Sequence, residues 1–193
     1  MHIMKGEPRT DTREAILAAA RASVQRGGYS ALSFRDLAAD VGIKSASVHH
    51  HFPTKADLAE ALLGRYSEDL SAILDPLVDA SFDEAIAGYV ALFRSFVNDA
   101  NEMCLGGMMS AEVNALSAPV RAQIARFAKT NTDWLRGVLA KGHPELSAIQ
   151  LDARASAIFA AMQGALLTTH GRGGNPEIFD QIIESYRSSG LMA

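Results

Sequence analysis

Side chains able to bind a phosphate or a base edge are concentrated in one short segment that follows Gly42. They are Lys44, Ser45, Ser47, His49 and His50. A lysine ammonium can pair with a phosphate oxygen or with guanine, and a serine hydroxyl both donates and accepts hydrogen bonds. Ala46, between the two serines, is small enough to let the backbone approach a ligand closely. This grouping favours binding to a nucleic acid.

Two short predicted helices, separated by Gly42, must position these side chains. The first covers residues 34–41, where apolar residues recur at helical spacing. The second begins with Ser45 as its cap and ends at Phe52. Together they predict a helix-turn-helix, in which the second helix lies in the major groove of DNA. An ordinary helical hairpin has the same bare pattern, so the motif alone leaves that alternative open.

The rest of the chain is also predicted to be helical, with no convincing alternation that would indicate a strand. Capping residues, Gly and Pro mark the helix ends. Thr10 or Asp11 caps the first helix, which Gly27 and Gly28 end. The other expected helices cover residues 34–41, 45–52, 54–77, 81–97, a short stretch in 103–116, 118–142, 147–171 and 176–186. The predicted fold class is therefore all-α, with about nine helices.

Composition excludes several classes of protein. The 193 residues are 48% hydrophobic, which is too many for a disordered chain. A single cysteine excludes an intrachain disulfide framework and a cysteine zinc cluster. The longest uncharged stretch, residues 155–171, is too short and too polar to span a bilayer. We therefore expect a cytoplasmic protein with no membrane partner.

The charge is divided unevenly along the chain. Residues 1–66 hold 9 basic and 7 acidic side chains, whereas residues 67–193 hold 9 and 15. A mildly basic first third on an acidic body suggests that only the N-terminal part meets an anion.

The segment FRDLAADVGIKSASVHHHFPTKADL closely resembles the Tet repressor (TetR) family of transcriptional regulators. Its second half resembles the family hallmark of leucine or valine, two aromatics, His, Phe and then a Lys that opens the fourth helix. TREAILAAA and the glycines that follow it resemble the family's first helix and turn. The sequence departs from the pattern at His49 and His50, where tyrosines are common. The resemblance is strong over about the first third of the chain.

This resemblance implies a DNA-binding domain over residues 1–54 and a ligand-binding and dimerisation domain over residues 55–193. The implied DNA contacts are Ser33, Arg35, Lys44, Ser45, Ser47, His49, His50 and Lys55. It further implies a homodimer, formed through helices eight and nine, that binds a palindromic operator on double-stranded DNA. The implied function is a ligand-responsive regulator, most simply a repressor, and not an enzyme.

The family's effector cavity would fall among aromatic and sulfur-containing residues of the C-terminal part. The candidates are Phe93, Phe96, Met103, Cys104, Met108, Phe127, Trp134 and Met162. Methionine adapts its shape and aromatic rings stack, so this set suits a flat apolar effector. The same stripe of Met and Phe also fits a plain hydrophobic core, and that interpretation stays open.

Cys104 is the one thiol of the chain and starts a helix-like segment, where a helix dipole favours a thiolate. The motif CLGGMMSAE also resembles a branch of the family that includes quinone- and electrophile-sensing repressors. An inert buried thiol is the simpler alternative. An enzyme that uses Cys104 as nucleophile with His143 or His170 as base is a second alternative, and a DNA-binding adaptor that recruits a protein is a third.

We expect no metal site and no cofactor. Successive residues of a helix are about 100° apart, so His49, His50 and His51 cannot converge on one ion.

Overall fold

The structure is a computed structural model that describes residues 11–98 and 102–192. Nine α-helices and three short 3-10 helices (η) are present in these residues, as the sequence predicts for an all-α fold. Their bounds are α1 Thr12–Gly27, η1 Tyr29–Ala31, α2 Phe34–Val41, α3 Ser45–His51, α4 Lys55–Leu74, η2 Asp75–Leu77, α5 Phe82–Asn98, α6 Leu105–Ala111, η3 Val113–Ala115, α7 Ala118–Gly142, α8 Ala148–Gly171 and α9 Pro176–Ser188.

Capping side chains fix where the main helices begin. Thr54 and Asp57 form a reciprocal capping box at the start of α4, and Ser147 and Gln150 form another at the start of α8. Asn175 caps α9 just before a proline at its first position. Each cap satisfies backbone N–H groups that have no partner inside the helix. These predicted starts are confirmed.

Two predicted helix boundaries differ from the structure in detail, and a third is confirmed. Lys44, not Ser45, is the N-cap of α3, and no side chain caps this helix. The fourth helix ends at Leu74 rather than near residue 77, because Pro76 has no N–H to continue it and the chain tightens into η2. Asp11 caps α1 by accepting from the amide of Arg13, while Thr10 lies outside the described residues.

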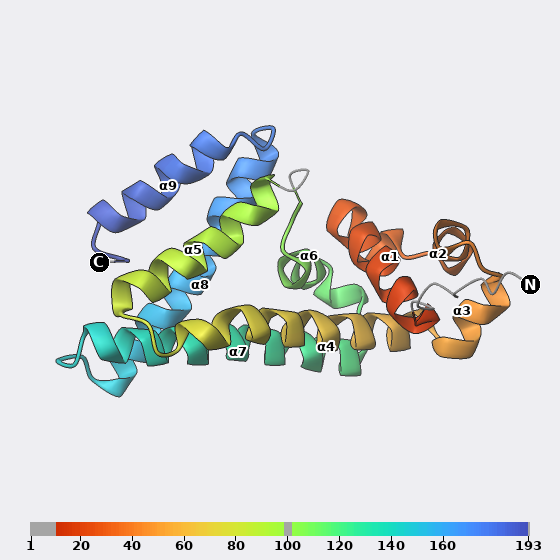
Figure 1. The fold of residues 1–193 in the computed structure, drawn as a ribbon, viewed down its shortest axis with the longest axis horizontal. Coiled ribbons are helices and arrows are strands. Elements are labelled where there is room, and N and C mark those ends of the chain that lie inside the picture. The colour runs from red at the N-terminus through yellow and green to blue at the C-terminus, as the bar shows by residue number, and fades with distance from the viewer. Residues whose placement is uncertain (1–10, 99–101, 193) are drawn as a thin grey trace, which may run out of the picture.

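The helices fall into two groups joined by α4 (Figure 1). At one end α1, α2 and α3 form a small three-helix unit around buried Val48 and Phe52. The long α4 extends from this unit along α7 towards the other end, where α5, α8 and α9 lie. The short α6 sits between α1 and α7, so it is the part of the larger group that faces the three-helix unit.

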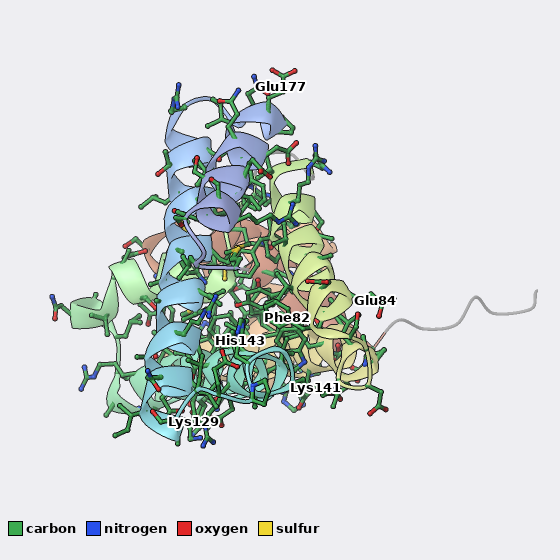
Figure 2. All side chains as sticks on the ribbon, turned by 90° about the vertical axis from the view of Figure 1, so that its left-hand side faces the viewer. Phe82, Glu84, Lys129, Lys141, His143 and Glu177 are labelled. Carbon is green, nitrogen blue, oxygen red and sulfur yellow. The ribbon has the colours of Figure 1, made fainter. Side chains whose placement is uncertain are left out.

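The C-terminal end of α7 packs against the start of α5 and the residue that follows η2. The rings of Phe82 and His143 meet edge to face with centroids 5.1 Å apart, and the Lys141 ammonium donates to the carbonyl of Val78. Figure 2 labels Phe82, Lys141 and His143 at this end of the molecule. None of the described helices has an apolar stretch of the length and hydropathy that a membrane crossing requires.

Candidate DNA interface and effector site

The predicted recognition helix, α3, is held by two buried residues and exposes most of the others. Val48 and Phe52 are 0% and 2% exposed and pack into the core of the three-helix unit. Gly42 ends α2 in the left-handed conformation, and the Ile43 amide then donates to the carbonyl of Ala38. This turn directs the start of α3 away from the core.

Most of the predicted DNA contacts lie on the surface of this unit. The exposed ones are Arg35, Lys44, Ser45, His49 and His50. Ser33 and Ser47 are half-buried, and the Ser33 hydroxyl already caps α2 by accepting from the amide of Asp36. The His49 ring lies 4.7 Å from that of Phe34, edge to face, which restricts its orientation. The surface therefore offers cations, hydroxyls and imidazoles from two adjacent helix starts.

Lys55 is placed differently from the other predicted contacts. Its ammonium lies 4.4 Å from the centre of the Tyr29 ring and donates to the carbonyl of Ser30 at 3.3 Å. Partial burial lowers the pKa of Lys55, and the Glu112 carboxylate opposes that shift. Lys55 opens α4 as predicted, but its side chain is engaged with the turn after α1.

The described residues contain no group of three or more His, Cys, Asp or Glu side chains arranged to hold a metal ion. The His50 and His51 rings instead contact each other edge to face, with centroids 5.6 Å apart.

A cavity of about 270 Å³ lies between α6, α7 and α8. Its walls are largely apolar, with one amide and one hydroxyl. The lining residues are Gly106, Gly107, Ser110, Ile124, Phe127, Ala128, Phe159 and Gln163. Of the residues that the sequence nominated, Phe127 lines this cavity. Because the walls offer two aromatic rings and few polar groups, the space suits a small apolar molecule.

The glycine pair after Cys104 allows α6 to approach its neighbours closely. A Cβ atom at Gly106 would lie 2.3 Å from the Phe127 ring, and one at Gly107 would lie 2.6 Å from Oε1 of Gln163. A side chain at Gly106 would clash with the Phe127 ring, and one at Gly107 would displace the end of the Gln163 side chain. The sequence showed these glycines but gave no sign of their partners on α7 and α8.

The Cys104 thiol lies behind the same cavity. It is 1% exposed and is the N-cap of α6. The Tyr66 hydroxyl donates to its sulfur at 3.7 Å and the Gln163 amide at 3.3 Å. Burial raises the pKa of Tyr66 well above its usual value, and the neighbouring thiol adds to this shift, so the phenol remains a proton donor. Gln163 therefore touches both the cavity and the thiol.

The other nominated residues do not converge on this cavity. Met103, Phe93 and Met162 are buried, and Met108 is half-buried. Phe96 lines a groove of about 130 Å³ between α1, α4 and α5. Trp134 lines a depression of about 230 Å³ on the outside of α7, where its indole N–H donates to the carbonyl of Leu74.

Of the two bases that the sequence offered for an enzyme with Cys104 as nucleophile, His143 and His170, His143 is engaged away from the thiol. The donors to its sulfur are Tyr66 and Gln163. His143 instead meets Phe82 and the carboxylate of Glu145, 3.3 Å from its Nδ1. A thiolate nucleophile normally depends on such a base.

Comparisons with known proteins give one match to the N-terminal helices and others to the fold of the whole chain. A family model described as bacterial regulatory proteins, tetR family, matches residues 16–62, which span most of α1 through the first turns of α4. A TetR transcriptional regulator from Legionella pneumophila has the same fold, with a TM-score of 0.87 and 29% identity, over 95% of this chain and 99% of that chain.

Two further relatives are more distant or shorter in overlap. FadR from Bacillus subtilis, solved in complex with stearoyl-CoA, has a TM-score of 0.71 at 17% identity over 89% of this chain and 95% of its own. That identity shows a common fold alone. The nucleoid occlusion factor SlmA of Photobacterium profundum is 32% identical over 81 residues, 42% of this chain, and the match spans 41% of SlmA.

The helix-turn-helix surface, the family model over it and the whole-chain structural match agree. Residues 16–62 form a DNA-binding unit of the TetR family of bacterial regulatory proteins, and the whole chain has the fold of a TetR transcriptional regulator.

Proposed function

We propose that this protein is a ligand-responsive transcriptional regulator, a repressor that leaves a palindromic operator when an effector binds. The observation that carries the proposal is the start of α3, where Lys44 and Ser45 are exposed while Val48 anchors the helix from behind. In a helix-turn-helix, the first residues of the second helix reach base edges in the major groove. Binding to chromosomal DNA would place the protein in the cytoplasm.

Within this proposal, residues 1–54 bind DNA and residues 55–193 bind the effector and form the dimer. Lys44, Ser45, Ser47 and His50 face the groove, while Ser33, Arg35, His49 and Lys55 hold phosphates on either side. Most such contacts fix the register of the protein on the duplex, and a few read bases. The exposure of Arg35 and Lys44 leaves both side chains able to reach DNA.

We infer that the dimer forms through α8 and α9. Small or apolar residues that the monomer leaves exposed follow one face of α8 at helical spacing. They are Ala153, Ala157, Ala160, Leu167 and Thr168. Leu167 is 61% exposed, which is unusual for a leucine that no partner covers. Ala165, on the same helix, is buried within the monomer and contributes to its own core.

The effector is inferred to be a small apolar or electrophilic molecule that enters the α6–α7–α8 cavity. Phe127 and Phe159 would stack on it, and the Gln163 amide would orient it. The ring centroids of Phe127 and Phe159 lie 6.1 Å apart, and both residues line the cavity. An electrophile admitted past Gln163 would meet the sulfur of Cys104, since that amide lies 3.3 Å from it.

The experiment that tests this function is selection of bound duplexes from a randomised DNA library by the full chain, followed by fluorescence anisotropy on the selected site. We expect a palindrome whose half-site centres are about 34–36 Å apart, one helical turn. Leu167→Glu would place charges on the dimer face and abolish tight binding, with Leu167→Ala as its milder control. Selection of no sequence, or of a single half-site, would contradict the proposal.

A DNA-binding adaptor that recruits another protein is the second candidate. The relatives named nucleoid occlusion factors favour it, although they match only part of the chain. An adaptor needs no empty interior, whereas the 270 Å³ cavity supports an effector. Release from DNA by a small molecule alone would decide for the repressor.

A further inference from the structure

A single carboxylate joins the effector half to the turn that follows α1. Glu112 accepts hydrogen bonds from the backbone amides of Tyr29 at 2.6 Å and Ser30 at 3.2 Å. It also accepts one from the Ser30 hydroxyl. These contacts cross 82 and 83 positions of sequence, so they tie together two parts that are far apart in the chain. Hydrogen bonds to an ionised carboxylate are stronger than those between neutral groups.

The turn is shaped to receive this side chain. Gly28 is buried and has a φ of +74°, a conformation that other residues rarely adopt. A Cβ atom at this position would lie 2.0 Å from Oε1 of Glu112. The backbone conformation therefore requires glycine, a side chain there would have to displace the Glu112 carboxylate, and the two amides that follow Gly28 donate to that carboxylate.

Lys55 holds the opposite side of the same turn. Its ammonium donates to the carbonyl of Ser30, whose amide and hydroxyl donate to Glu112. The ammonium also lies over the ring of Tyr29, whose amide Glu112 accepts. Movement of the Glu112 carboxylate would therefore alter the two groups that hold Lys55. We define Glu112, Tyr29, Ser30 and Lys55 as the Glu112 latch.

The other end of the connection is the effector cavity. Glu112 is the C-cap of α6, and its own amide donates to the carbonyl of Met109 at 3.2 Å. Two residues before it, Ser110 lines the cavity, as do Gly106 and Gly107 on the same helix. A helix of seven residues with this packing moves as one body, so a ligand that displaces α6 also displaces Glu112.

The start of α6 provides a second tie to the same unit. The Gln25 side chain on α1 is 3% exposed, and its amide donates to the carbonyl of Met103 at 3.1 Å. This neutral bond fixes the segment just before Cys104. The Glu112 latch differs because it is charged, lies at the end of α6 near η1, and includes Lys55. Figure 1 shows α6 lying between α1 and α7, as both ties require.

We propose that Glu112 is a positioning residue that couples the state of the α6–α7–α8 cavity to the DNA-binding unit through Tyr29, Ser30 and Lys55. The inference rests on the proposed function and names the route of its regulation. With the cavity empty, the latch holds the turn between α1 and α2. A bound molecule shifts α6, the carboxylate leaves the two amides, and the turn and Lys55 are released together.

The test uses a double-mutant cycle that needs no known effector. Ala128→Phe adds a ring to the cavity wall and mimics occupancy, while Glu112→Ala removes the latch. In the otherwise unchanged protein we expect Ala128→Phe to alter the affinity for the selected operator about fivefold or more, the usual range of allosteric coupling. In the Glu112→Ala background the same filling should leave the affinity unchanged.

Glu84→Ala is the matched control. Glu84 likewise accepts from the amide and hydroxyl of one serine, Ser81, but at the start of its own helix. Glu84→Ala removes comparable hydrogen bonds without affecting the three-helix unit. In the Glu84→Ala background, Ala128→Phe should therefore keep its full effect on operator affinity. Hydrogen exchange at the amides of Tyr29 and Ser30 should accelerate in Glu112→Ala and in Ala128→Phe, but not in Glu84→Ala.

An equal response to cavity filling with and without Glu112 overturns the latch and leaves the proposed function intact. No response in either background, with exchange at Tyr29 and Ser30 unaffected, also overturns it. If circular dichroism shows that Ala128→Phe does not fold, Ile124→Trp fills the same cavity from α7. Failure of the unchanged protein to bind any duplex would instead count against the proposed function, while the exchange measurement still tests the latch.

Discussion

The three-helix unit and the effector half organise their functional side chains in opposite ways. The proposed DNA contacts on α3 are nearly consecutive, and two buried anchors, Val48 and Phe52, orient all of them. The effector cavity instead takes its walls from three helices, between Gly106 and Gln163. A surface built on one short helix can be read from a short run of sequence, whereas a cavity depends on how distant helices pack.

The largest expected effect is on the free energy of unfolding, when one aromatic ring is removed from the three-helix unit and, for comparison, one from the effector half. Phe52 is 2% exposed, and the Arg13 guanidinium lies 5.3 Å from its ring centre. Because the three-helix unit has a small core, Phe52→Ala should cost about 3–5 kcal/mol and abolish operator binding. Phe159→Ala, at a half-buried position that already borders a cavity, should cost less. Urea unfolding of both variants measures the loss of unfolding free energy. Equal losses would contradict the proposed difference in packing between the two regions.

The next effect tests whether α3 reads sequence as well as shape. Lys44 is exposed at the N-cap of α3. If its ammonium binds a base, Lys44→Ala should relax preference at one operator position by about 1–3 kcal/mol. Selection from a randomised operator library, with Ser47→Ala analysed in parallel, measures the preference. An unaltered operator motif would show that Lys44 binds only phosphate. Base reading would then not depend on this residue at the start of α3.

A third prediction concerns Lys55, where the two regions meet. Lys55→Ala removes one proposed phosphate contact, so the slope of log K against log salt concentration should shrink by about one unit. The loss should be similar on all DNA sequences. Arg35→Ala, with a side chain that is 89% exposed, is the control for a phosphate contact outside the latch. A sequence-selective loss at Lys55 with an unchanged slope would assign the residue to the latch alone.

Sequence reasoning recovered the elements whose signals are local. Ser33, Thr54, Ser147 and Asn175 each mark a helix start, because a cap is decided by a few neighbouring residues. The all-α class followed from apolar spacing that repeats along the whole chain. Assignment to the TetR family likewise rested on a continuous segment and is confirmed.

The cavity and the Glu112 latch carry no comparable local signal. Aromatic and sulfur-containing side chains fill cores as readily as they line pockets, so the sequence could not separate buried Phe93 and Met162 from Phe127. Gln163 and Phe159 were missed because their role depends on where α8 lies against α6. Glu112 resembles any solvent-exposed acid in sequence, although Gly28, its steric partner, was visible as part of a turn.

The smallest expected effect lies within the effector half, at the ion pair between α5 and α9. Arg94 donates to both carboxylate oxygens of Asp180, at 2.7 and 2.8 Å, and these bonds lower the pKa of Asp180. Because both side chains are more than a third exposed, Asp180→Asn should destabilise the protein only slightly at pH 7, and less at high salt. A lowered native pKa stabilises the fold above the ordinary carboxyl pKa of 3.8, and this contribution is lost as pH falls through the native value. Urea unfolding of both proteins should therefore give the same stability in acid, and a difference that persists there would show that Asp180 acts through packing rather than charge.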